Sequence, residues 1–117
     1  MWKSVDSAKG INFVHGDSAK LSAAIDKTFA HIYFDMIYID GGHTKDDVLY
    51  DFNNLRKYIR NTTILAFDDC DPRFPGVEEA VNMIAAEMGF SINLVTFWPA
   101  AYNVALAGKP EEISRIL

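Results

Sequence analysis

Two short apolar segments that run directly into carboxylates constrain the fold of this chain more than any other feature. The first is Phe34–His43 (FDMIYIDGGH) and the second is Ile64–Cys70 (ILAFDDC). Apolar strands covered by helices are parallel in open α/β sheets, and ligands bind beyond the carboxyl ends of such strands. We therefore expect Asp40, Asp68 and Asp69 to converge at one edge of a sheet.

These three aspartates are candidate ligands for a divalent metal ion. Carboxylates held close together repel one another, and a bound divalent cation with oxygen ligands relieves that repulsion. The alternative is that Asp40 and Asp69 only open loops, where aspartate is common because its side chain caps helices and turns. The residues themselves leave both interpretations open.

The composition is that of one globular domain spanning residues 1–117. Half of the residues are hydrophobic, less than a quarter are charged, and the formal net charge is −5. A negative chain disfavours nucleic-acid binding, which needs positive charge to displace counterions. No apolar run reaches the roughly 18 residues that span a bilayer.

The single cysteine, Cys70, fits a reducing compartment, so we expect a cytoplasmic protein with no membrane partner. Because Cys70 follows two aspartates, we expect a buried filler rather than a nucleophile.

The spacing of apolar residues predicts strands alternating with helices. The expected strands are 10–15, 34–39, 62–67, 90–98 and 102–107. Ser18 and Thr44 are expected to cap the first two helices, and a third is expected from Val77 to Met88, ended by Gly89. The 34–39 strand is apolar on both faces, which predicts a central parallel strand. The last two strands surround a turn at Pro99 and are expected to pair antiparallel.

This order of elements, with its two acidic segments, resembles the C-terminal part of a class I S-adenosylmethionine-dependent methyltransferase of the family 24 type. The matching residues are 13–18 (FVHGDS), 34–43 and 66–69 (AFDD). The resemblance implies an α/β fold with a partial Rossmann-like sheet. Its strands would be parallel apart from a C-terminal antiparallel hairpin, with helices mainly on one face.

The resemblance also implies a metal site. In this family and in related catechol-type O-methyltransferases, an Asp after one strand and an acidic pair after the next hold a divalent metal. Those positions fall on Asp40, Asp68 and Asp69, so the implied cofactors are S-adenosylmethionine and Mg²⁺ or another divalent cation. The metal is thought to bind two substrate oxygens and to lower the pKa of the hydroxyl group.

Further roles follow from the same resemblance. Asp17 and Ser18 fall where the family contacts the adenine ring, and Asp40 and Gly41 are also candidates for cofactor binding, although Ser18 is expected to cap a helix in any case. His43 falls where catechol-type relatives carry a basic residue that helps to remove the substrate proton. Its alternative role is to cap the second helix or to hydrogen-bond an aspartate.

The residues before Gly10 contain no counterpart of the family's first strand and Gly-rich loop. The expected function is therefore O-methylation of a hydroxylated small molecule by an incomplete form of the enzyme. The alternatives are a non-catalytic remnant that acts as an oligomerisation or binding module, and a metal-dependent hydrolase. Right-handed crossovers would place all the helices on one face, so the strand at Met36–Ile39 should expose apolar residues on the other. Either the natural protein is longer and its further residues cover them, or a second copy does; for the 117-residue chain alone a homodimer is expected.

Overall fold

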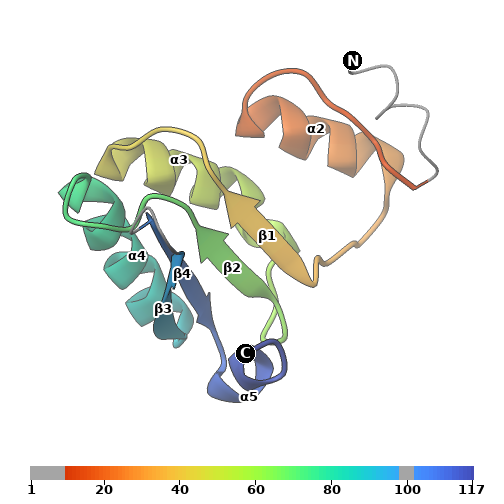
Figure 1. The fold of residues 1–117 in the computed structure, drawn as a ribbon. Coiled ribbons are helices and arrows are strands. Elements are labelled where there is room, and N and C mark those ends of the chain that lie inside the picture. The colour runs from red at the N-terminus through yellow and green to blue at the C-terminus, as the bar shows by residue number, and fades with distance from the viewer. Residues whose placement is uncertain (1–9, 98–101) are drawn as a thin grey trace. The chain divides into compact units, whose positions relative to one another are not determined.

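The computed structural model describes residues 10–97 and 102–117 (Figure 1). The elements in chain order are α2 (Ser18–Thr28), β1 (Met36–Ile39), α3 (Lys45–Leu55), the 3-10 helix η1 (Arg56–Tyr58), β2 (Ile64–Phe67), α4 (Pro75–Met88), β3 (Ser91–Phe97), β4 (Tyr102–Gly108) and α5 (Pro110–Ser114). The chain divides after His31 into two compact units. The first contains α2, and the second contains every strand.

The second unit is built on a four-stranded sheet with the strand order β1-β2-β4-β3. Strands β1 and β2 are parallel, with Ile39 opposite Phe67, whereas β4 pairs antiparallel with both β2 and β3. The predicted partial Rossmann-like α/β fold with a C-terminal antiparallel hairpin is therefore confirmed. The expected turn at Pro99, with Trp98 before it, lies outside the described residues.

Strand β1 lies at an edge of the sheet, because among the described residues it pairs with β2 alone. Its side chains alternate, with Ile37 and Ile39 buried and Met36 and Tyr38 exposed by 49% and 55%. The prediction of a central strand at 34–39 is therefore wrong, and β2, whose four residues are all buried, takes the central place. The expected apolar exposure on β1 is confirmed. The homodimer that would cover it stays a prediction.

Helix α3 forms as its sequence predicts. The Asp47 backbone N–H donates to the Thr44 hydroxyl at 3.1 Å, and the Thr44 backbone N–H donates to the Asp47 carboxylate at 3.4 Å, which completes a capping box. Val48 and Phe52 face the core one turn apart. The cap fixes where the helix begins, and so fixes the loop that joins it to β1.

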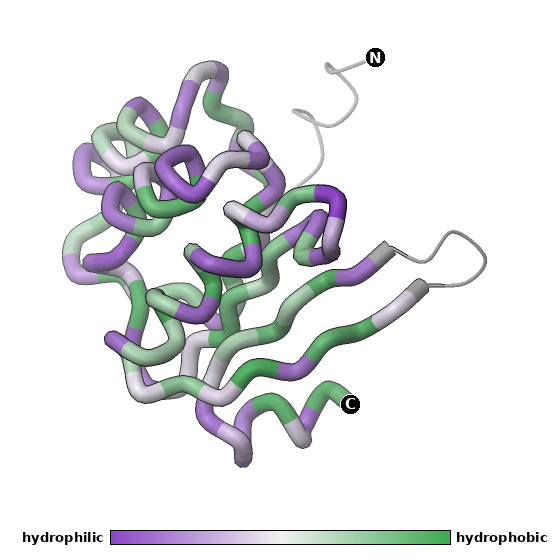
Figure 2. Tube along the Cα trace, turned by 90° about the vertical axis from the view of Figure 1, so that its left-hand side faces the viewer, coloured by the Kyte–Doolittle hydropathy of each residue, from purple (hydrophilic) through white to green (hydrophobic). Residues whose placement is uncertain are grey.

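Helix α4 lies beside α3 on one side of the sheet (Figure 1). It begins at Pro75, and Gly89 ends it in the left-handed conformation with a φ of +67°. Its buried side includes Val77, Val81 and Ile84. In Figure 2 the helical segments alternate between hydrophilic and hydrophobic residues, whereas the strands are largely hydrophobic, as expected when helices cover a sheet. No helix in the described ranges has both the length and the apolarity required to cross a bilayer.

The first unit departs from the sequence prediction in two ways. Residues 10–15 form no strand, because strand propensity needs a paired strand and none of the described residues forms a strand with this segment. Asp17 rather than Ser18 is the N-cap of α2, and its carboxylate accepts a hydrogen bond from the Lys20 backbone N–H at 3.1 Å. The two residues are adjacent and both are good caps, so propensity alone does not choose between them.

Candidate metal centre

The carboxyl ends of β1 and β2 bring three aspartates together. Asp40 follows Ile39, Asp68 follows Phe67, and the Asp68 backbone N–H donates to the Ile39 carbonyl at 3.0 Å, which extends the strand pairing by one residue. Asp69 is next in the chain. Carboxylate oxygens of Asp40, Asp68 and Asp69 lie within 4.8 Å of one another. The structure therefore places these three residues as expected from the parallel strands, while metal binding itself stays a prediction.

The three carboxylates interact unfavourably. Partial loss of hydration raises the pKa of Asp40, and a hydrogen bond with Asp68 together with the charges of Asp68 and Asp69 raises it further. His43 acts in the opposite direction. Oxygen donors with this much negative charge suit a hard divalent cation such as Mg²⁺, so the donor set fits the metal that the family implies.

Asp69 is held in an uncommon backbone conformation. Its φ of +57° lies in the left-handed region, which aspartate tolerates better than most residues. Hydrogen bonds fix the loop on its C-terminal side, since the Asp71 N–H donates to the Asp69 carbonyl at 3.0 Å and the Cys70 N–H donates to the Asn103 carbonyl of β4 at 3.1 Å. The Asp69 side chain is thereby turned back toward the strand ends.

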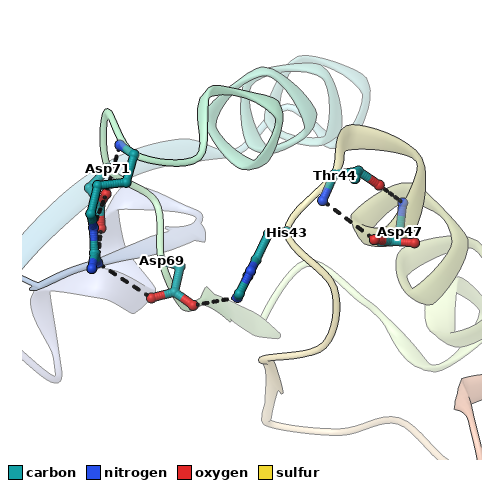
Figure 3. A network of polar contacts seen from close by, with 6 residues as sticks. His43, Thr44, Asp47, Asp69 and Asp71 are labelled. Carbon is teal, nitrogen blue, oxygen red and sulfur yellow. Dashed lines mark hydrogen bonds and ion pairs between the residues drawn. The ribbon is translucent and has the colours of Figure 1, made fainter.

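His43 contacts this cluster from the β1 side. Its Nε2 lies 3.0 Å from Asp69 Oδ2 (Figure 3). Its ring stacks on Phe74 with the centroids 4.1 Å apart. The side chain is 49% exposed, so the imidazole remains accessible to solvent. This contact with Asp69 fits the alternative in which His43 lies against an aspartate, and a part in proton transfer stays a prediction.

The glycines before His43 allow the loop to lie against α3. A Cβ on Gly41 would lie 2.7 Å from Asp51 Oδ2, and a Cβ on Gly42 would lie 2.1 Å from Asp47 Oδ2. Asp47 belongs to the capping box and has little freedom to move. The structure thus gives a reason why position 42 carries no side chain.

The first turns of α3 and α4 also meet beside the cluster. A Cβ on Gly76 would lie 2.7 Å from the Lys45 backbone nitrogen, so the two backbones are in contact there. The strand ends, the loop to α3 and the two helices line a shallow cleft. Its lining residues are Ile39, Asp40, Gly41, Gly42, His43, Val48, Phe67, Asp68, Asp69 and Val77.

Tyr38 belongs to this site, although the sequence analysis did not single it out. Partial loss of hydration, followed by the charges of Asp68 and Asp40 and a hydrogen bond with Asp68, raises the pKa of its hydroxyl. The signal was present in the sequence, because residues two apart in a strand share a face and Tyr38 precedes Asp40 by two. The phenol is therefore a neighbour of the cluster.

Arg73 is the second residue that the sequence analysis missed. Its guanidinium lies 2.8 Å from Asp71 Oδ2 and 3.7 Å from Asp69 Oδ1. Hydrogen bonds from Arg73 hold the pKa of the Asp71 carboxyl below its usual range, although burial acts in the opposite direction. The sequence from Pro72 to Gly76 indicates a loop with turn chemistry, but nothing in it shows that the arginine folds back toward Asp69.

The residues proposed to contact the cofactor are divided between the two units. Gly41 and Asp40 line the cleft. Asp17 and Ser18 lie at the start of α2 in the first unit, where Asp17 is the helix cap. Binding of S-adenosylmethionine by any of these four residues stays a prediction.

Cys70 should react slowly in the folded protein. It is 4% exposed, and burial, with smaller effects from Glu78 and Asp71, raises the pKa of its thiol to about 11. The thiolate is the reactive form, so alkylation by iodoacetamide at pH 7.5 should be at least about tenfold slower than in urea-unfolded protein. Mass spectrometry of timed samples measures both rates. Equal rates would contradict the view that Cys70 only fills space.

In open α/β domains, ligands bind beyond the carboxyl ends of parallel strands, and the acidic side chains and the cleft lie at that position here. The model of a family described as a methyltransferase domain, methyltransferase family 24, matches residues 2–70. The chain belongs to this family. A comparison with curated proteins finds no match. The matched range includes Asp40, His43, Asp68 and Asp69, and it ends at Cys70, within the loop after β2 and before Arg73.

Proposed function

We propose that this protein is a divalent-metal-dependent O-methyltransferase that uses S-adenosylmethionine and a hydroxylated small molecule. The observation that carries the proposal is the meeting of Asp40, Asp68 and Asp69, with carboxylate oxygens within 4.8 Å of one another, in a chain of a methyltransferase family. When bound, a divalent cation lowers the pKa of a substrate hydroxyl that it coordinates. Asp40, Asp68 and Asp69 are the residues that would hold it.

His43 is the proposed proton acceptor. With Nε2–H donating to Asp69, Nδ1 is the ring atom left to accept the substrate proton. The Asp69 carboxylate would then stabilise the imidazolium that forms. S-adenosylmethionine, when bound, would supply the methyl group for the substrate oxygen. His43 would take up the proton that the substrate hydroxyl loses.

Calorimetric titration of the purified, folded chain tests the proposal. S-adenosylmethionine is added with and without Mg²⁺, after a separate titration with Mg²⁺ alone. Heat from both ligands supports a methyltransferase, whereas cation binding without any cofactor binding favours a metal-dependent hydrolase. A folded chain that binds neither ligand contradicts the proposal and favours a non-catalytic remnant.

A further inference from the structure

The loop after β2 is folded around one arginine. Arg73 donates to the Asp71 carboxylate from its backbone N–H at 3.0 Å, from Nε at 2.9 Å and from Nη2 at 2.8 Å. The Asp71 side chain is only 4% exposed. A two-pronged pair between arginine and a carboxylate fixes the plane as well as the position of the guanidinium. Arg73 therefore has a defined orientation although its side chain is 53% exposed.

Asp69 lies between this guanidinium and His43. Arg73 Nη2 is 3.7 Å from Oδ1, and His43 Nε2 is 3.0 Å from Oδ2, so each carboxylate oxygen has a positively polarised neighbour. Figure 3 shows the Asp69 side chain with a contact on both sides, from His43 and from the direction of Asp71. The two contacts restrict rotation of a carboxylate whose backbone is already fixed in the left-handed region.

The positive charge of Arg73 and the orientation that it gives Asp69 have opposite effects on the affinity for a cation. A unit charge about 6 Å from a divalent ion in a water-like medium weakens cation binding roughly tenfold, or about 1.4 kcal/mol. A carboxylate that is already held in the right orientation strengthens cation binding, because the side chain loses little rotational freedom when the cation binds. A lysine in place of the arginine keeps the charge and removes the two-pronged geometry, so it separates the two effects.

We propose that Arg73, held by Asp71, is a positioning residue that orients the Asp69 carboxylate for a divalent cation. The proposal rests on the proposed metal-dependent function. Arg73 acts through Asp69 and does not itself coordinate the ion. Asp71 in turn holds Arg73. In the loop after β2, Asp71 therefore orients Arg73, and Arg73 orients the proposed metal ligand Asp69.

The test is the affinity for Mn²⁺, measured by electron paramagnetic resonance of the free ion at constant ionic strength. Arg73→Lys should bind Mn²⁺ about three- to tenfold more weakly than the wild type, near the lower end of the effect of losing a residue that supports a ligand. Arg115→Lys is the matched control, because Arg115 forms an exposed pair with Glu112 on α5. It should bind like the wild type.

A double-mutant cycle then tests the route through Asp71. Asp71→Asn alone should weaken Mn²⁺ binding by a similar factor, and the same change in an Arg73→Lys background should add little. Thermal unfolding of each variant shows whether it is folded. If Asp71→Asn is unfolded, the affinity of Arg73→Lys for Mn²⁺ alone tests the positioning role. Unchanged affinity in Arg73→Lys overturns the positioning role alone. A wild type that binds no Mn²⁺ overturns the proposed function and this inference together.

Discussion

Asp68→Ala should lower the affinity for Mn²⁺ on the order of a hundredfold or more. Loss of a residue that only supports a ligand costs about 10- to 100-fold, so loss of a ligand itself should cost at least the upper end of that range. Asp68 supplies one of the three carboxylates that meet within 4.8 Å, and it is the one that interacts most closely with Asp40. Calorimetry or paramagnetic resonance measures the affinity directly.

Asp35→Ala is the matched control for this variant. Asp35 lies one residue before β1, at the opposite end of the strand from Asp40, and its side chain is exposed. The Asp35→Ala substitution changes the net charge by the same amount as Asp68→Ala and leaves the three clustered aspartates in place. The cation-free Asp68→Ala protein should stay folded, because the change removes one member of a repelling group. Wild-type affinity in folded Asp68→Ala would rule out the proposed metal centre.

Gly76→Ala should destabilise the protein by about 1–2 kcal/mol. The added methyl group would lie 2.7 Å from the Lys45 backbone nitrogen, which cannot move without shifting the first turn of α3. Overpacking of this kind costs about 1–3 kcal/mol, and the better helix propensity of alanine returns up to about 1 kcal/mol. Urea unfolding followed by circular dichroism measures the difference.

Gly108→Ala provides the comparison in the same background. A Cβ at this position in β4 would have its neighbours at 3.5 Å, an ordinary contact distance. Its stability should equal or slightly exceed that of the wild type, since glycine is unfavourable in a strand. If Gly76→Ala is as stable as Gly108→Ala, the close contact between α3 and α4 is not a constraint on the fold.

Sequence patterns predicted the elements whose signals are local. The capping box of Thr44 and Asp47, the αL glycine at position 89 and the apolar runs of β1 and β2 each specify a structure from neighbouring residues. The convergence of Asp40 with Asp68 followed from the rule for parallel strands. These features depend on chemistry within a few residues and on one general property of sheets.

Other features depended on which segments become neighbours. Residues 10–15 have a strand-like sequence but form no strand with any of the described residues. Strand β1 lies at an edge of the sheet because pairing between strands decides their position. The supporting role proposed for Arg73 depends on a bend that brings positions 69, 71 and 73 together. Spacing along the chain does not reveal a contact that a left-handed residue and a turn create.

The position of β4 between β2 and β3 means that the candidate metal ligands depend on a strand much later in the sequence. The three candidate metal ligands precede Cys70, where the family match ends. Strand β2, however, pairs with a strand that is synthesised much later, and the Cys70 backbone N–H donates to the Asn103 carbonyl. A piece of the chain cut at Cys70 would keep each aspartate and lose the neighbour that holds their strand in the sheet. Because β2 pairs with β4, the sheet that holds the cluster is complete only once β4 has been synthesised.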